Sequence, residues 1–259
     1  MKKVFIWICC FVWCYALGIT AQTVTPESLV RNVDESALFR NDTSVYVVKL
    51  KMDWPEHIGN NTMLSLQHYL TQFFFDEEGD KFLPALSLFT RTKGLPADSM
   101  PDFSDEHRYY IDCTLKLLWY APDEWLTLYA YKQERNGEGR VLSSKRQYFT
   151  YDMKNDKVIT QKDIFNQSRL WGTYDDDYRI VFEELVEHFA QVGEHDYIDM
   201  SKVPQNVALY QNRLMIDLGE SATNVGRDNM SLIPLEHLTF LFTKDFKKRV
   251  KTKNRPTGE

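Results

Sequence analysis

Alternation of apolar and polar residues marks the middle of the chain as a β-sheet. Between Tyr109 and Trp119 every second residue is apolar, and most of the residues between them are polar. A period of two predicts a strand with one buried and one solvated face. Residues 45–52 show the same alternation, so we expect another strand there.

The segment after residue 119 is typical of consecutive hairpins. A turn at residues 121–124 (APDE) precedes a strand over 125–131, and a turn at 135–140 (RNGEGR) precedes a strand over 145–152. Such short connections leave no room for a crossover helix. We therefore expect an antiparallel meander.

Helical spacing of apolar residues appears in three places. It predicts helices over residues 63–74, 175–191 and 235–242. Residues 81–103 contain three prolines and are interpreted as irregular. Residues 207–218 have the pattern of a further hairpin.

Residues 148–165 (YFTYDMKNDKVITQKDIF) predict a strand, a polar turn, a short strand and the start of a helix. Thr160 and Asp163 have the spacing of a capping box, in which each side chain binds a backbone N–H of the other residue. This segment contains turn, cap and core residues without an obvious catalytic group. We expect it to form the seam between two halves of the protein.

The predicted fold class is α+β, an antiparallel sheet meander with packed helices in two intimately associated subdomains. The subdomains are assigned to residues 42–135 and 136–245. A polar lead-in, residues 22–41, is expected to hold at most a short helix near residues 26–33. Residues 246–259 are expected to be a basic, solvated tail.

The N-terminus has the pattern of a secretory signal peptide. Lys2 and Lys3 precede an uncharged apolar run over residues 4–19, with small residues at Gly18 and Ala21. We expect cleavage after Ala21, so that residues 1–21 are removed and the chain is extracytoplasmic. Cleavage after Gly18 and retention as an anchor are the alternatives. No stable membrane span is expected after cleavage.

Cysteine content and net charge limit the disulfides that the chain can form and the kinds of partner that it can bind. Cleavage would leave Cys113 as the last cysteine, which excludes an internal disulfide. Loss of Lys2 and Lys3 would change the formal net charge from −6 to −8. This balance disfavours nucleic acid and is compatible with a basic protein or a cell-wall ligand.

The sequence predicts no catalytic site, metal site or cofactor. It lacks a glycine-rich phosphate loop and a GxSxG serine elbow. An envelope hydrolase would need converging histidine and carboxylate groups, for which His188, His195 and Glu184 are the candidates. Their spacing does not match a known zinc motif, so surface histidines are the simpler interpretation.

Aromatic residues gather around the 121–124 turn and supply the candidate ligand-binding residues. Such rings either fill the two faces of a sheet or anchor an interface. Tyr120 and Trp125 flank the turn, so we expect these two to be exposed and available to a ligand. The cluster is Trp119, Tyr120, Trp125, Tyr129 and Tyr131.

A Tyr-Asp pair, a charged turn and the run Ile-Thr-x-x-Asp-Ile-Phe within residues 148–165 resemble a bacterial extracytoplasmic domain of unknown function. That domain forms the outer part of the lysozyme-sensing anti-sigma factor and accompanies the catalytic domain of a peptidoglycan deacetylase. The order of the downstream elements is similar as well. One departure is the turn Gly137-Glu138-Gly139-Arg140, where the family often carries a histidine.

The resemblance implies a non-enzymatic binding module at the cell envelope, with a lysozyme-type protein or a glycan as ligand. The chain carries neither a cytoplasmic anti-sigma segment nor a deacetylase domain. The alternatives are the hydrolase described above and a structural envelope protein without a soluble ligand.

Overall fold

The computed structural model describes residues 30–55, 63–76, 79, 81–99, 103–171, 176–190, 197–198, 206–219, 222–223 and 230–253. The expected signal peptide, the start of the lead-in, His195 and the last six residues lie outside these ranges. The fold class is α+β, as predicted. No helix in the described ranges has both the length and the apolarity to cross a membrane.

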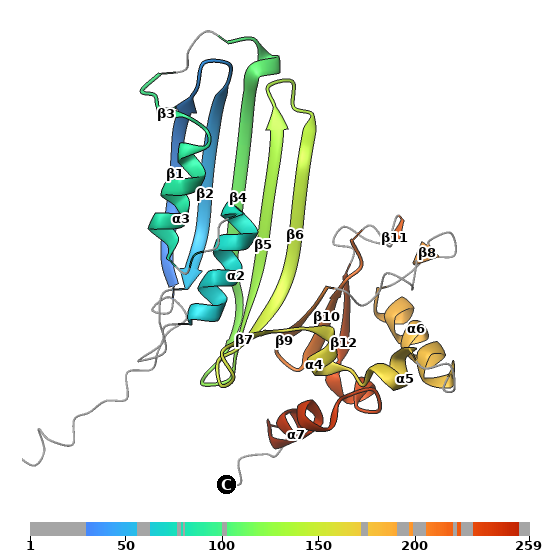
Figure 1. The fold of residues 1–259 in the computed structure, drawn as a ribbon. Helices are drawn as coiled ribbons and strands as arrows, with labels where there is room; N and C mark the ends of the chain where they lie inside the picture. The colour runs from blue at the N-terminus through green and yellow to red at the C-terminus, as the bar shows by residue number, and fades with distance from the viewer. Residues whose placement is uncertain are drawn as a thin grey trace, which may run out of the picture.

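A seven-stranded sheet forms the larger part of the molecule (Figure 1). Its strands, in spatial order, are β3 (Leu95–Pro96), β1 (Val30–Arg40), β2 (Val45–Pro55), β4 (Arg108–Ala121), β5 (Trp125–Asn136), β6 (Val141–Asp152) and β7 (Lys157–Ile159). The run β4–β5–β6–β7 is the predicted antiparallel meander. The pairing of β2 with β4 is parallel, which the sequence did not indicate.

A parallel pair needs a crossover, and two helices supply it. They are α2 (Leu64–Phe75) and α3 (Phe82–Arg91), which lie on one face of the sheet (Figure 1). The interpretation of residues 81–103 as irregular is wrong for α3. Pro84 is tolerated because it lies in the first turn, where its missing N–H is not needed.

The alternation predicted for β4 is confirmed: Ile111, Cys113 and Leu115 are buried and face α2 and α3. We call this side of the sheet the helix-covered face. A β-bulge between Leu117 and Trp119 inserts one residue and reverses the alternation beyond it. Trp119 therefore packs against a second hydrophobic core, which is formed mainly by residues from Ile159 to Val250 and is called the C-terminal core. Tyr120 packs on the helix-covered face.

The C-terminal unit contains a three-stranded antiparallel sheet in the order β12–β10–β9. Its strands are β9 (Val207–Tyr210), β10 (Arg213–Asp217) and β12 (Met230–Pro234), and two short strands, β8 (Tyr197–Ile198) and β11 (Ala222–Thr223), pair separately. Its helices are α4 (Gln161–Ile164), α5 (Gln167–Trp171), α6 (Asp176–Ala190), the 3₁₀ turn η4 (Leu235–Leu238) and α7 (Lys244–Lys253). The predicted capping box of Thr160 and Asp163 is present at α4.

Both ends of the described chain are more ordered than the sequence indicated. The expected lead-in contains β1, which pairs with β2 along its whole length, so the helix expected near residues 26–33 is wrong from Val30 onward. The expected helix 235–242 is only the turn η4. The expected solvated tail begins inside α7, because Phe246 and Val250 are buried in the C-terminal core.

The hydrophobic cores do not divide at residue 136. That position falls in the β5–β6 hairpin, whose two strands belong to one sheet. One core includes residues from Val33 to Met153, and the other includes most of its residues from Ile159 to Val250. The second core also takes Ala121 and Trp125 from the turn of the β4–β5 hairpin.

Two buried threonines join the C-terminal unit to the large sheet. The Thr127 hydroxyl donates to the Leu209 carbonyl (2.6 Å), and the Leu209 N–H donates to the Thr150 hydroxyl oxygen (2.7 Å). The hydroxyl oxygens lie 2.9 Å apart. Because the Thr127 hydroxyl group donates its hydrogen to the Leu209 carbonyl, the Thr150 hydroxyl group must donate to the Thr127 oxygen. Both hydroxyl groups and both backbone groups of Leu209 are then hydrogen-bonded.

Replacing Thr150 with valine keeps the shape and removes the acceptor of the Leu209 N–H. We expect Thr150→Val to lower the free energy of unfolding by about 1–3 kcal/mol, the usual cost of an unsatisfied buried donor. Thr114→Val, on a half-buried position of β4, is the matched control and should change it by less than about 0.5 kcal/mol. Urea unfolding measures both; equal effects would contradict the role given to Thr150.

Candidate ligand-binding face

The two residues expected to bind a ligand lie on different faces of the sheet. Trp125 is 2% exposed, so its expected exposure is wrong. Its ring packs 6.2 Å from the Phe246 ring, and the Arg249 guanidinium lies 4.8 Å from its centre. Tyr120 is half-buried on the helix-covered face, as a result of the bulge.

Arg249 covers Trp125 because it is held by Asp152, whose side chain is only 2% exposed. Both guanidinium amino groups donate to this carboxylate, one of them at 3.1 Å, and Asn155 donates as well. Burial alone would raise the pKa of Asp152. The hydrogen bonds and charge of Arg249, with the help of Asn155, outweigh burial and lower it.

A polar cleft of about 460 Å³ lies beside this ion pair. The 148–165 segment lines one side of it and α7 the other. Two of its three lining cations form ion pairs, Arg249 with Asp152 and Lys157 with Asp163. These contacts give the cleft a stabilising role. The lining residues are Asp152, Asn155, Lys157, Ile159, Lys162, Asp163, Thr243, Asp245, Phe246 and Arg249.

The structure describes two of the three candidate hydrolase residues. Glu184 and His188 are exposed on α6, one turn apart on the same helix, and His195 lies outside the described residues. Within the described ranges no cluster of three or more His, Cys, Asp or Glu side chains could hold a metal ion.

The sheet face opposite α2 and α3 carries a group of tyrosines, which we call the tyrosine face. Tyr129 and Tyr131 follow one another on this side of β5, and Tyr148 is the partner of Tyr129 on β6. The rings of Tyr129 and Tyr131 are parallel within 8° at 6.4 Å, and those of Tyr129 and Tyr148 lie 4.9 Å apart. Tyr110 on β4 belongs to the same face, and all four tyrosines are half-buried.

Cations surround these rings. One row of cross-strand neighbours consists of Lys51, Thr114, Tyr131 and Arg146. Lys116 is the partner of Tyr129 in the adjacent row. Exposed lysines lie beside the half-buried aromatic rings of the tyrosine face, and Asp34 on β1 is the cross-strand neighbour of Lys51.

The C-terminal unit fixes one border of the tyrosine face. Asp217 on β10 receives two hydrogen bonds from Arg146, at 2.6 and 3.0 Å. Asn206 donates to the same carboxylate and accepts the backbone N–H of Tyr148. Burial raises the pKa of Tyr129 against the opposing charge of Arg146, so its hydroxyl remains a hydrogen-bond donor at neutral pH.

On the other border, Arg135 holds Asp112 at 2.7 Å and lies 6.0 Å from the Tyr110 ring centre. The sequence placed Tyr129 and Tyr131 in the aromatic cluster, but the two residues that flank the turn were the expected ligand-binding residues. Tyr129 and Tyr131 alternate with the buried residues Leu128 and Ala130, and this alternation places the two tyrosines on the face opposite the helices.

No protein-family model matches the chain, and no curated protein matches it. The structure is similar to two solved proteins of the DUF3298 family, a bacterial family of unknown function. With the protein from Bacteroides fragilis it shares 14% identity at a TM-score of 0.59, over 86% of this chain and 96% of the other. With the protein from Pseudomonas aeruginosa it shares 10% identity at a TM-score of 0.50, over 86% and 98%. At these identities the likeness shows a shared fold.

The Asp152–Arg249 pair predicts a pH dependence. The lowered pKa of Asp152 means that its stabilisation is complete above its unfolded pKa of about 3.9 and is lost as the pH falls through the folded pKa. We expect Arg249→Met to lower the free energy of unfolding by about 3 kcal/mol at pH 7, because it leaves a buried carboxylate without its cation. This deficit should shrink below about pH 4, as the carboxyl group becomes protonated.

Chemical unfolding from pH 7 to pH 3 measures this change. Arg140→Met, at an exposed position in the β5–β6 turn, is the control and should track the wild type throughout. A deficit in Arg249→Met that is constant with pH would contradict the coupling to Asp152.

Proposed function

We propose that this chain is an exported, non-enzymatic protein of the bacterial cell envelope that binds a cell-wall-related glycan on its tyrosine face. The observation that carries the proposal is the group of Tyr129, Tyr131 and Tyr148 on a regular sheet, with two rings parallel at 6.4 Å. Tyrosine offers a broad rigid surface at low entropic cost and a hydroxyl for hydrogen bonding. These properties suit sugar rings, whose C–H faces pack on aromatic rings.

The charges around the rings favour an anionic glycan. Lys51 and Lys116 are exposed, and no described side chain forms an ion pair with either. Arg146 and Arg135 are already neutralised by carboxylates. The lysines are therefore available to the carboxylates of a cell-wall polymer.

A basic, lysozyme-type protein is the second candidate ligand. It is favoured by the resemblance of residues 148–165 to the lysozyme-sensing ectodomain and by the net charge of −8 expected after cleavage. The lysines of the tyrosine face disfavour it at that site. Binding of such a protein would therefore use a different surface and should resist changes in the tyrosines.

The binding prediction concerns single tyrosines. Tyr131→Ala should weaken binding to soluble peptidoglycan fragments at least about tenfold, the loss typical of an aromatic anchor. Tyr46→Ala removes a tyrosine from the opposite face and should leave binding unchanged. Isothermal titration calorimetry measures both, with circular dichroism to check folding and lysozyme as a second ligand. Equal binding by Tyr131→Ala and the wild type would overturn the assignment of this face.

Export is tested separately. The chain expressed in a bacterial host should be recovered outside the cytoplasmic membrane with Gln22 as its first residue, as cleavage after Ala21 requires. N-terminal sequencing and fractionation measure this. Recovery of the uncleaved chain in the cytoplasm would contradict the proposed location without bearing on the tyrosine face.

A further inference from the structure

Among the described residues, the outer edge of β1 is paired only near its C-terminal end. β3 pairs only with Phe39 and Arg40, and Ala97 adds one hydrogen bond to the Leu38 carbonyl. Over residues 30–37 no described strand pairs with the side of β1 that faces away from β2. In the described part of the chain, no hydrogen bond engages the outward backbone groups of residues 32–37, so this part of the edge can bind another strand.

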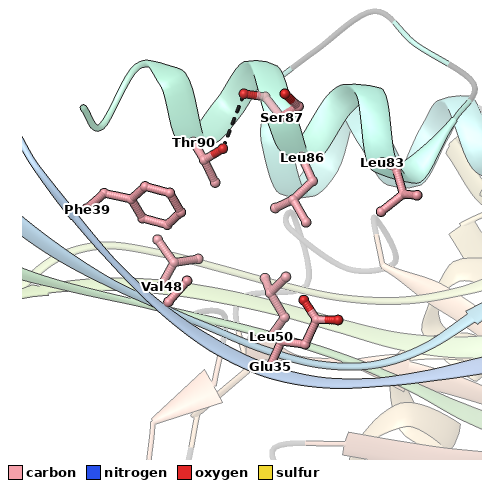
Figure 2. A pocket seen from close by; sticks show the side chains of 9 residues that line it. Glu35, Phe39, Val48, Leu50, Leu83, Leu86, Ser87 and Thr90 are labelled. Atoms are coloured by element: carbon pink, nitrogen blue, oxygen red, sulfur yellow. Dashed lines mark hydrogen bonds between the residues drawn. The ribbon is translucent and has the colours of Figure 1, made fainter. Parts of the chain in front are cut away.

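An apolar groove of about 320 Å³ lies next to this edge, between the sheet and α3 (Figure 2). Figure 2 shows Leu83, Leu86 and Thr90 of α3 facing the strand side chains across the gap. Leu83 lines this groove and is 58% exposed. The groove is lined by Glu35, Ala37, Phe39, Val48, Leu50, Leu83, Leu86, Ser87 and Thr90.

The sequence of β1 explains why the groove is not filled. Side chains on the helix-covered face of β1 alternate as Val33, Glu35, Ala37 and Phe39. Val33 is buried in the core, whereas Ala37 is too small and Glu35 too polar to fill the space beneath Leu83. α3 uses a different stripe, Phe82, Ala85 and Phe89, to pack on the sheet.

Glu35 gives the groove a charge preference. Its carboxylate is exposed at the rim, and within the described ranges no hydrogen bond or ion pair engages it. Charged residues at a strand edge oppose the addition of wholly apolar strands. An added strand that carries a lysine or arginine opposite Glu35 would instead gain a cross-strand ion pair.

We propose that the edge of β1 and this groove bind an extended segment of a partner protein as an added strand, with an apolar side chain in the groove and a basic side chain on Glu35. The backbone of the segment satisfies the open edge. Alternate side chains point to the same face, so neighbours two residues apart reach Ala37 and Glu35. This site is separate from the tyrosine face and does not depend on the function proposed for it.

Other occupants fit the observations less well. A lipid chain would fill the apolar space but leave the backbone groups of β1 unpaired. A second copy of the chain that pairs β1 with itself about Asp34 or Glu35 would oppose like charges. Pairing about Val33 would set Arg31 against Glu35, and the light-scattering measurement below tests for that dimer. A basic strand satisfies the edge, the groove and the carboxylate together.

Peptides of about nine residues that alternate threonine and valine, with the central valine replaced by lysine or glutamate, test the proposal. Fluorescence anisotropy of the labelled peptides with the purified chain measures binding. We expect the lysine peptide to bind about threefold to tenfold more tightly than the glutamate peptide, and Glu35→Lys to reverse the order. Glu138→Gln, at an exposed turn, and Tyr131→Ala should leave both affinities unchanged.

Filling the groove provides a second readout. Ala37→Phe should abolish binding of the lysine peptide without loss of thermal stability, because it fills an open space on the surface. The proposal is overturned if wild type does not discriminate between the peptides, or if Ala37→Phe binds like wild type. It is also overturned if light scattering shows a dimer that Glu35→Lys dissociates, since the occupant would then be a second copy.

Discussion

The hydrogen-bonded set of Thr127, Thr150 and Leu209 is the constraint on which the arrangement of the molecule depends. The C-terminal unit brings the backbone of β9 onto the large sheet, where water cannot satisfy it. Two hydroxyl groups on adjacent strands provide one donor and one acceptor for the same residue of β9. Both backbone groups of Leu209 are therefore paired at the point where the two hydrophobic cores share one sheet.

The bulge at Leu117 and Trp119 is the second requirement for this sharing. Without the inserted residue, Trp119 would stay on the helix-covered face of β4. With it, Trp119 joins Trp125 in the C-terminal core while Tyr120 remains with the other core, and Trp125 reaches that core through the regular alternation of β5. Arg249 then covers Trp125, and its pairing with Asp152 connects α7 back to the end of β6.

Sequence periodicity predicted the elements whose burial is one-sided. The β4 strand, the meander, α6 and the Thr160–Asp163 capping box follow from local patterns and are present. β1 escaped prediction because only Val33 is buried along it, so it has no alternation to detect. The parallel β2–β4 pair and the packing of α3 depend on contacts distant in sequence, which local periodicity does not encode.

The candidate site was predicted less well, for a related physical reason. Proximity to a turn normally indicates exposure, and for this reason Tyr120 and Trp125 were expected to be exposed. In the structure the C-terminal unit covers Trp125, whose ring packs against Phe246. Among the described residues, the short strands β9 and β10, four and five residues long, reach the edge of the tyrosine face at Tyr148 and Arg146. This edge, where Asp217 and Asn206 hold Arg146 and Tyr148, is the place where the C-terminal unit determines the shape of the surface.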